Sequence, residues 1–204
     1  MASLKPLIRE VMDAARAQLV ELNFRKRSAD LYTYELNAES LGWLALMRVV
    51  VKDQGIQLMP NVGVRNQRIE KMVAELSGEP FHPYHPPTLL SSIGYLMEQK
   101  QYLCWSFTSD GENAVIMQHM VQSICVYGIP FMKANADLNS VLDALLLTRY
   151  SIRQDYTLPI AYLLSGKPQE ARACVTKYVN TLGKDPTAQN YRGFAANLLK
   201  RLAS

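Results

Sequence analysis

The stretch from Leu41 to Leu76 restricts the fold more than any other part of this sequence. It opens with two runs of β-branched and large apolar residues, Leu41–Val51 and Ile56–Val64, joined by a short glycine-containing segment. This pattern predicts a β-hairpin. Apolar residues at helical spacing follow up to Leu76, so the second strand should lead into an amphipathic helix. A hairpin with so many apolar residues is not stable by itself, and we expect it to form part of a sheet covered by helices.

The flanking sequence predicts the elements that complete such a sheet. Helical spacing indicates an amphipathic helix over residues 4–22 with Asn23 as a left-handed cap, and alternation indicates a strand over 31–36. Four prolines in the nine residues Glu79–Pro87 exclude helix and ladder strand there. Further strands are expected at 92–98 and 102–107, a helix over 112–127 ending at Gly128, a helix capped by Asp137, and three helices after residue 157, the last starting at Asp185-Pro186.

These elements predict a single α+β protein. We expect an antiparallel sheet of about five strands with helices packed against it in residues 1–148. Residues 149–204 read as a helical extension that packs on this domain. At 204 residues the chain is long enough for one such structural unit.

Composition favours a soluble protein of the cytoplasm. The apolar fraction is 49% and the charged fraction 20%, as in ordinary globular proteins. No run approaches the roughly 18 apolar residues of a membrane span, and the N-terminus has no apolar signal core. The three cysteines match no zinc or redox spacing and lie among apolar neighbours, so a reducing compartment is expected.

Charge gives a weak indication of partners. The net charge is +4, but the chain from Arg149 onward holds nine basic and three acidic residues, or +6. That imbalance permits an acidic partner, and a solvated helical surface explains it equally well. Arg25–Arg27 beside Tyr32 and Tyr34 has the chemistry of a nucleic-acid patch. Basic residues after a helix also complement its dipole, and this second interpretation is preferred, so no nucleic-acid partner is predicted.

No residue pattern identifies a catalytic or metal site. His82 and His85 have a spacing that can share one metal ion, but no third or fourth ligand lies nearby, so neither metal nor cofactor is predicted. Cys104 and Cys125 lack a histidine placed to activate them and are interpreted as core residues. Nucleophile-elbow, phosphate-loop and dinucleotide motifs are absent, so no catalytic residue is assigned and the chain is not expected to be an enzyme.

What remains is a group of aromatic and histidine side chains around the proline-rich segment and the second strand pair. Aromatic residues anchor many protein interfaces. The predicted partner-binding residues are Phe81, His82, Tyr84, His85, Tyr102 and Trp105.

The order of these motifs resembles a known group of proteins. An amphipathic helix leads into Leu22-Asn-Phe-Arg-Lys-Arg27, an aromatic strand, a hydrophobic hairpin, Tyr102-Leu-Cys-Trp-Ser-Phe107 and Tyr127-Gly-Ile-Pro-Phe-Met132. This order is similar to that of small bacterial α+β proteins of unknown function, some of which resemble immunity proteins of contact-dependent inhibition and polymorphic toxin systems. The resemblance covers about residues 4–147 and carries no catalytic residue. The segment 161–172 also resembles the turn of one tetratricopeptide-type hairpin.

The leading hypothesis is a non-enzymatic protein-binding protein of the cytoplasm, an immunity protein that neutralises a cognate toxin by occlusion. Two alternatives stay open. One is an enzyme whose site is assembled from scattered residues such as Arg65, His82, His85 and Cys104. The other is an adaptor that binds an acidic partner through the basic C-terminal helices.

Overall fold

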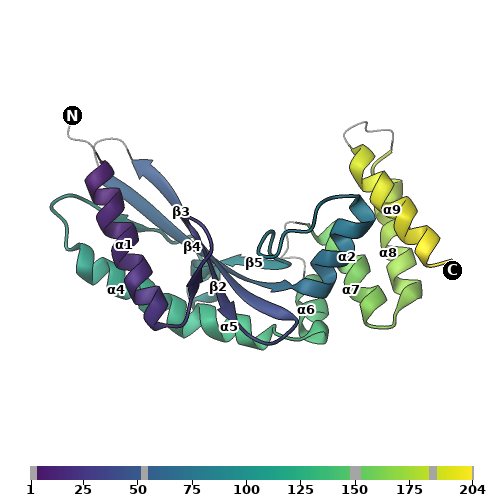
Figure 1. Ribbon diagram of the computed structural model, residues 1–204, viewed down its shortest axis with the longest axis horizontal. Helices are drawn as coiled ribbons and strands as arrows, with labels where there is room; N and C mark the ends of the chain where they lie inside the picture. The colour runs from purple at the N-terminus through teal and green to yellow at the C-terminus, as the bar shows by residue number, and fades with distance from the viewer. Residues whose placement is uncertain (1–3, 52–54, 148–152, 184–187, 204) are drawn as a thin grey trace. The chain divides into compact units, whose positions relative to one another are not determined.

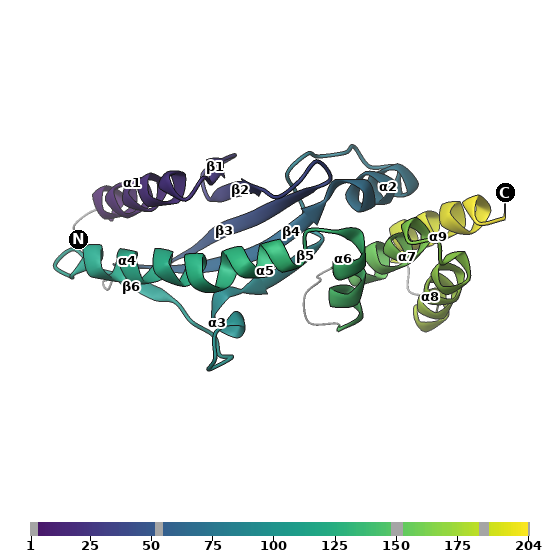
Figure 2. The same ribbon diagram turned by 90° about the horizontal axis from the view of Figure 1, so that it is seen from below.

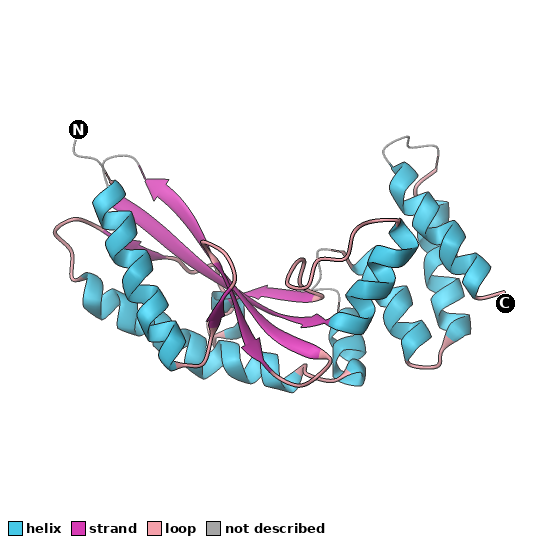
Figure 3. Ribbon diagram, viewed as in Figure 1, coloured by secondary structure: helices cyan, strands magenta, loops and turns pink. Residues whose placement is uncertain are grey.

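The computed structural model describes residues 4–51, 55–147, 153–183 and 188–203. It confirms the α+β prediction, with an antiparallel sheet of six strands and helices (Figures 1 and 3). The chain forms two compact units. Unit 1 comprises residues 1–36, 41–63 and 90–134, and unit 2 comprises residues 37–40, 64–89 and 135–204. The predicted boundary between residues 148 and 149 lies outside the described residues.

The elements follow one another in an order close to the predicted one. The sheet order is β1-β2-β3-β4-β5, and β6 also pairs with β4. The elements are α1 (Lys5–Glu21), β1 (Arg25–Lys26), β2 (Leu31–Glu35), β3 (Ser40–Val51), β4 (Gly55–Asn66), α2 (Gln67–Ser77), β5 (Leu89–Ser92), α3 (Ile93–Leu96), β6 (Trp105–Phe107), α4 (Asn113–Ser123), the π-helix η1 (Ile124–Gly128), α5 (Ile129–Ala134), α6 (Leu138–Leu146), α7 (Gln154–Leu164), α8 (Pro168–Thr181) and α9 (Gln189–Arg201).

In unit 1 one face of the sheet is covered by the continuous helix that α4, η1 and α5 form, which Figure 2 shows as a single rod. A Cβ on Gly128 would lie 3.1 Å from Val62 of β4, and a Cβ on Gly42 of β3 would lie 2.7 Å from the sulfur of Met132. Glycine is therefore needed where this helix and the sheet approach each other most closely. The prediction that the helix ends at Gly128 was wrong, because Gly128 serves close packing there.

The first helix, α1, packs against α4 and β1 in the same unit. It buries Leu7, Val11, Ala15 and Leu19, which lie on one helical stripe. Asn23 follows in the predicted left-handed conformation, with φ of 67°. The predicted strand over 92–98 was wrong in part, because only Ser92 belongs to β5 and residues 93–96 form the short helix α3.

Unit 2 is mainly helical. Asn66 caps α2 by accepting a hydrogen bond from the Ile69 amide at 3.1 Å, and Asp137 caps α6 as predicted. Within this unit α7 packs against α8, α6 and α2, and α9 packs against α2 and α8. Rings contact one another between α7, α8 and α9, from Tyr156, Tyr178, Tyr191 and Phe194. The predicted start of the last helix at Asp185-Pro186 lies outside the described residues.

Candidate functional site

The proline-rich loop Glu79–Pro87 of unit 2 is held in place by one buried side chain. Arg65, near the end of β4, is 1% exposed, and its guanidinium donates hydrogen bonds to the backbone carbonyls of His82, Pro83 and Pro86. The amide of Gln67 donates a further bond to the Pro83 carbonyl at 3.0 Å. One side chain therefore holds the loop backbone at three residues.

An arginine suits this position because of what the loop lacks. Each proline has a carbonyl but no backbone N–H, so a segment with four prolines cannot satisfy its own carbonyl groups. The guanidinium has five N–H donors in a planar fork and can serve several acceptors at once. Arg65 thus provides the donors that the prolines remove.

The charge of Arg65 is balanced by Glu70 of α2. The Arg65 guanidinium lies 3.6 Å from a Glu70 carboxylate oxygen, and both side chains are 1–2% exposed. The Thr88 hydroxyl donates a hydrogen bond of 2.8 Å to the same carboxylate. Burial raises the pKa of Glu70, while Arg65 and Thr88 act in the opposite direction. The pair is therefore a desolvated ion pair whose separation would be costly.

The loop carries four of the six predicted partner-binding residues, Phe81, His82, Tyr84 and His85. Phe81 is 43% exposed, and the Arg65 guanidinium carbon lies 5.3 Å from the centre of its ring. His82 and His85 are exposed, with ring centres 6.4 Å apart, and Tyr84 is half-buried. The structure thus brings four of the six predicted residues together on one anchored loop.

The cavity beneath the loop is small. Its volume is about 30 Å³, far below the roughly 300 Å³ at which ordinary ligand pockets begin. This space is too small for an organic substrate. The lining residues are Arg65, Glu70, Val73, Ala74, Glu79, Pro80, Phe81, His82, His85, Pro86 and Arg153.

The titration of His85 offers a test of this arrangement. Burial, and then the neighbouring His82, Arg65 and Arg153, lower the pKa of His85. The folded protein therefore disfavours the protonated ring, and we expect stability to fall as pH drops through the unfolded value of about 6.5 until the folded pKa is passed. Ring-proton NMR should give a His85 pKa below that value. A His85→Gln variant should lose this part of the pH dependence of urea unfolding, and an unchanged profile would contradict the assignment.

Tyr102 and Trp105 belong to unit 1 and differ from each other in exposure. Tyr102 is 59% exposed, and its hydroxyl contacts the sulfur of Met59. Trp105 is only 4% exposed, and its indole N–H donates a hydrogen bond of 2.9 Å to Nδ1 of His119 on α4. The prediction of Trp105 as a surface contact needs correction, because its ring packs between β6 and α4 as part of the core.

The structure gives less support to a metal site or to an enzyme site assembled from scattered residues. Among the described residues no group of three or more His, Cys, Asp or Glu side chains is placed to hold a metal ion. Arg65, His82 and His85 meet in unit 2, whereas Cys104 lies in unit 1. Cys104, Cys125 and Cys174 are all free and half-buried.

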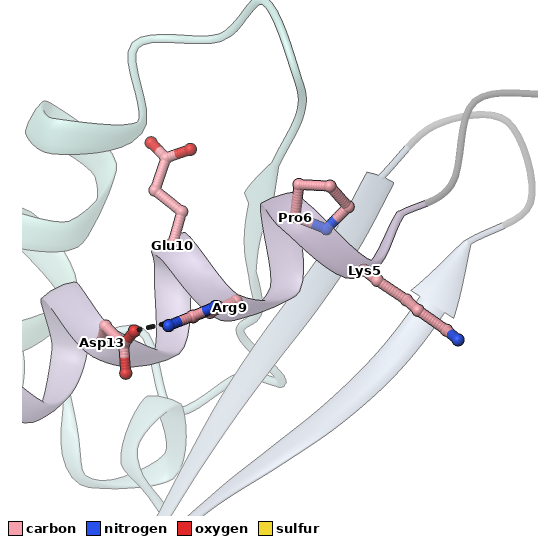
Figure 4. Close-up of a pocket in the computed structure, with 5 residues that line it drawn as sticks. All are labelled: Lys5, Pro6, Arg9, Glu10 and Asp13. Carbon is pink, nitrogen blue, oxygen red and sulfur yellow. Dashed lines mark ion pairs between the residues drawn. The ribbon is translucent and has the colours of Figure 1, made fainter.

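A surface depression of about 490 Å³ lies on α1 (Figure 4). Lys5, Pro6, Arg9, Glu10 and Asp13 line it, and Arg9 lies 3.8 Å from Asp13 in an exposed ion pair. Figure 4 shows Lys5 and Glu10 pointing in different directions from the helix. These groups do not converge on a common point, so they do not form a site.

Several arginine side chains of the C-terminal helices form ion pairs or hydrogen bonds within unit 2. Arg201 pairs with Glu75 at 2.9 Å, and Arg153 lies 3.9 Å from Glu79. Arg172 donates to the Leu202 carbonyl at 3.0 Å, and Arg192 to the Gly183 carbonyl at 2.6 Å. These contacts explain part of the basic excess as internal pairing, which weakens the case for an electrostatic docking surface.

Among the residues that the structure describes, one helix, Asn113–Ala134, is long and apolar enough to cross a membrane by length and composition. Its close contacts with Val62 and Gly42 give a simpler explanation, since a core helix that packs on a sheet has the same composition. Its buried residues include Met117, Met120 and Ile124.

Comparison with known proteins identifies no relative. No protein-family model, curated protein sequence or solved structure matches this chain. Its function has therefore to be inferred from its own residues, and the anchored loop Glu79–Pro87 is the most distinctive group that they form.

Proposed function

We propose that this chain is a non-enzymatic protein-binding protein and that the loop Glu79–Pro87 contacts the partner. The observation that carries this proposal is the anchoring of an aromatic loop by a buried arginine. Phe81, His82 and His85 are exposed, while the backbone that carries them is bonded to Arg65.

Anchoring of this kind favours binding for an entropic reason. A flexible loop loses conformational freedom when it docks, and this loss reduces the affinity. Prolines and the Arg65 hydrogen bonds have already restricted this loop in the free protein. Exposed aromatic rings on a restricted backbone can then contribute most of their contact energy to the complex.

The proposed partner is a toxin domain, and the proposed role is that of an immunity protein acting in the cytoplasm. The resemblance of residues 4–147 to proteins similar to toxin-system immunity proteins supports this partner class. Three free cysteines are consistent with a reducing compartment. Neutralisation by occlusion requires a rigid scaffold with a complementary surface, which the loop can supply.

The proposal is tested by capture followed by a binding measurement. The tagged full chain is used to retain partners from the cells that make it, at moderate salt, and the retained protein is identified by mass spectrometry and purified. Calorimetry then compares wild type with a Phe81→Ala, His82→Ala double variant. We expect about 10- to 100-fold weaker binding by the variant, as for loss of central aromatic contacts.

The matched control is Tyr95→Ala, which removes an aromatic ring that is 53% exposed on α3. This variant should bind as wild type does. Equal affinity of the loop variant and wild type would rule out the loop as the contact. A retained partner that is toxic when expressed alone, and harmless together with this chain, would establish the immunity role, and a harmless partner would refute it.

A further inference from the structure

Part of the hairpin in unit 1 has an open edge. β2 pairs with β3 only from Leu41 to Ala45, and the Leu46 amide donates to the Asp30 carbonyl at 2.9 Å. β3 continues to Val51. Within the described part of the chain, β4 is the only strand beside Met47–Val51, and Figure 1 shows β3 continuing past β2.

This open edge is apolar and accessible. Met47 is 53% exposed, Val49 45% and Val50 53%, and Arg48 is exposed as well. Exposed edge strands normally carry several charges or a proline, because their free N–H and C=O groups attract other strands. The outer strand β1, Arg25–Lys26, follows that rule with two exposed cations. The edge of β3 has a single charge.

The direction of the backbone groups follows from the pairing with β2. Leu46 points its N–H toward the β2 side, at Asp30. Because N–H and C=O groups of successive residues alternate between the two sides of a strand, those of Arg48 and Val50 point to the open side, and those of Met47, Val49 and Val51 point to β4. The open edge therefore offers two N–H donors and two C=O acceptors.

We propose that this edge of β3 pairs with the same edge of a second copy of the chain, in an antiparallel two-fold dimer with Val49 at the axis. In this register Arg48 of each copy lies opposite Val50 of the other. Both residues use all their outward backbone groups, which gives four intermolecular hydrogen bonds. Such a two-fold interface uses the same surface on both copies.

The neighbouring registers are less favourable. Pairing centred on Arg48 would place two like charges opposite each other and would require the Leu46 amide, which already bonds to Asp30. Pairing centred on Val50 would leave Arg48 without a partner residue inside the strand. With Val49 at the axis, Met47 instead lies opposite Val51, so the apolar side chains bury one another.

The test compares the oligomeric state of wild type and a proline variant. Sedimentation equilibrium of the wild-type chain should show a reversible monomer–dimer equilibrium. The Val50→Pro variant removes an N–H that points to the open side, so the pairing with β4 is preserved, as for natural prolines in edge strands. We expect its dimer dissociation constant to rise about tenfold or more through the loss of two hydrogen bonds.

A cysteine variant tests the register without relying on affinity. Residues at the axis face themselves, and in a non-hydrogen-bonded pair their Cα atoms lie about 4.5 Å apart, within the range of a disulfide. Val49→Cys should therefore give a disulfide-linked dimer under mild oxidation, whereas Arg48→Cys should give much less. Wild type, with its three free cysteines, measures the background.

Three outcomes overturn the proposal. The first is a wild-type chain that stays monomeric up to about 1 mM, which corresponds to negligible affinity. The second is a dimer that Val50→Pro leaves unchanged, since another surface would then form it. The third is stronger cross-linking by Arg48→Cys than by Val49→Cys, which would exclude the register.

Discussion

Replacing Arg65 with methionine should destabilise the protein by about 3 to 5 kcal/mol, the range found when one member of a buried ion pair is removed. Methionine fills a similar volume but donates no hydrogen bond. The carbonyls of His82, Pro83 and Pro86 would lose their donor, and the Glu70 carboxylate would remain buried without its cation. Urea unfolding at neutral pH measures the loss.

The control is the double variant Arg65→Met, Glu70→Gln, which removes the uncompensated charge. It should recover part of the lost stability, because an amide is far less costly to bury than a carboxylate. Limited proteolysis should still cut both variants faster than wild type within the loop Glu79–Pro87. A single variant within about 1 kcal/mol of wild type would contradict the anchoring role of Arg65.

Gly55→Ala should cost about 3 kcal/mol or more, through backbone strain and a steric clash together. Gly55 opens β4 with φ of 119°, a conformation that residues with a Cβ rarely adopt. A Cβ there would lie 2.0 Å from the Phe107 carbonyl oxygen of β6, a backbone atom held by the pairing of Ile56 with Phe107. Thermal and urea unfolding measure the effect.

Gly78→Ala is the matched control for this prediction. Gly78 also has a positive φ, of 67°, at the end of α2, but nothing lies within 4 Å of its Cβ position. Its replacement should cost only about 1 kcal/mol, the conformational part of the penalty. Equal losses for the two variants would show that the contact with Phe107 does not contribute.

The sequence correctly predicted those elements that are determined by residues adjacent in the chain. Alternation and turn composition identified the hairpin of β3 and β4, and Asp137 was recognised as a helix cap from its residue type and place. Gly128 led to a wrong prediction because the requirement for glycine there is not local. A glycine close before a proline usually marks a helix end. Here glycine is required by the close contact with Val62, which is distant in sequence.

Only part of the candidate site was predicted from the sequence. The prolines of residues 79–87 identified the loop, and residue type identified Phe81 and the histidines. The anchoring role of Arg65 was missed, since its pairing with loop carbonyls depends on the tertiary path of the chain. A single cation ending an otherwise apolar strand, followed by a segment poor in N–H groups, is the sequence signal that could have identified this role.

The interleaving of the two units along the chain has a consequence for synthesis. All residues of unit 1 have been made once residue 134 is added, whereas α2 must wait for α7 and α9, which pack against it. The Asn197 amide, for example, donates to the Leu76 carbonyl at 2.8 Å, across 121 positions of sequence. Because chains are synthesised from the N-terminus, the buried side chains of α2 lack packing partners from α7 and α9 until α9 has left the ribosome. During synthesis the apolar surface of α2 is therefore exposed to aggregation for longer than it would be if its packing partners were close in sequence.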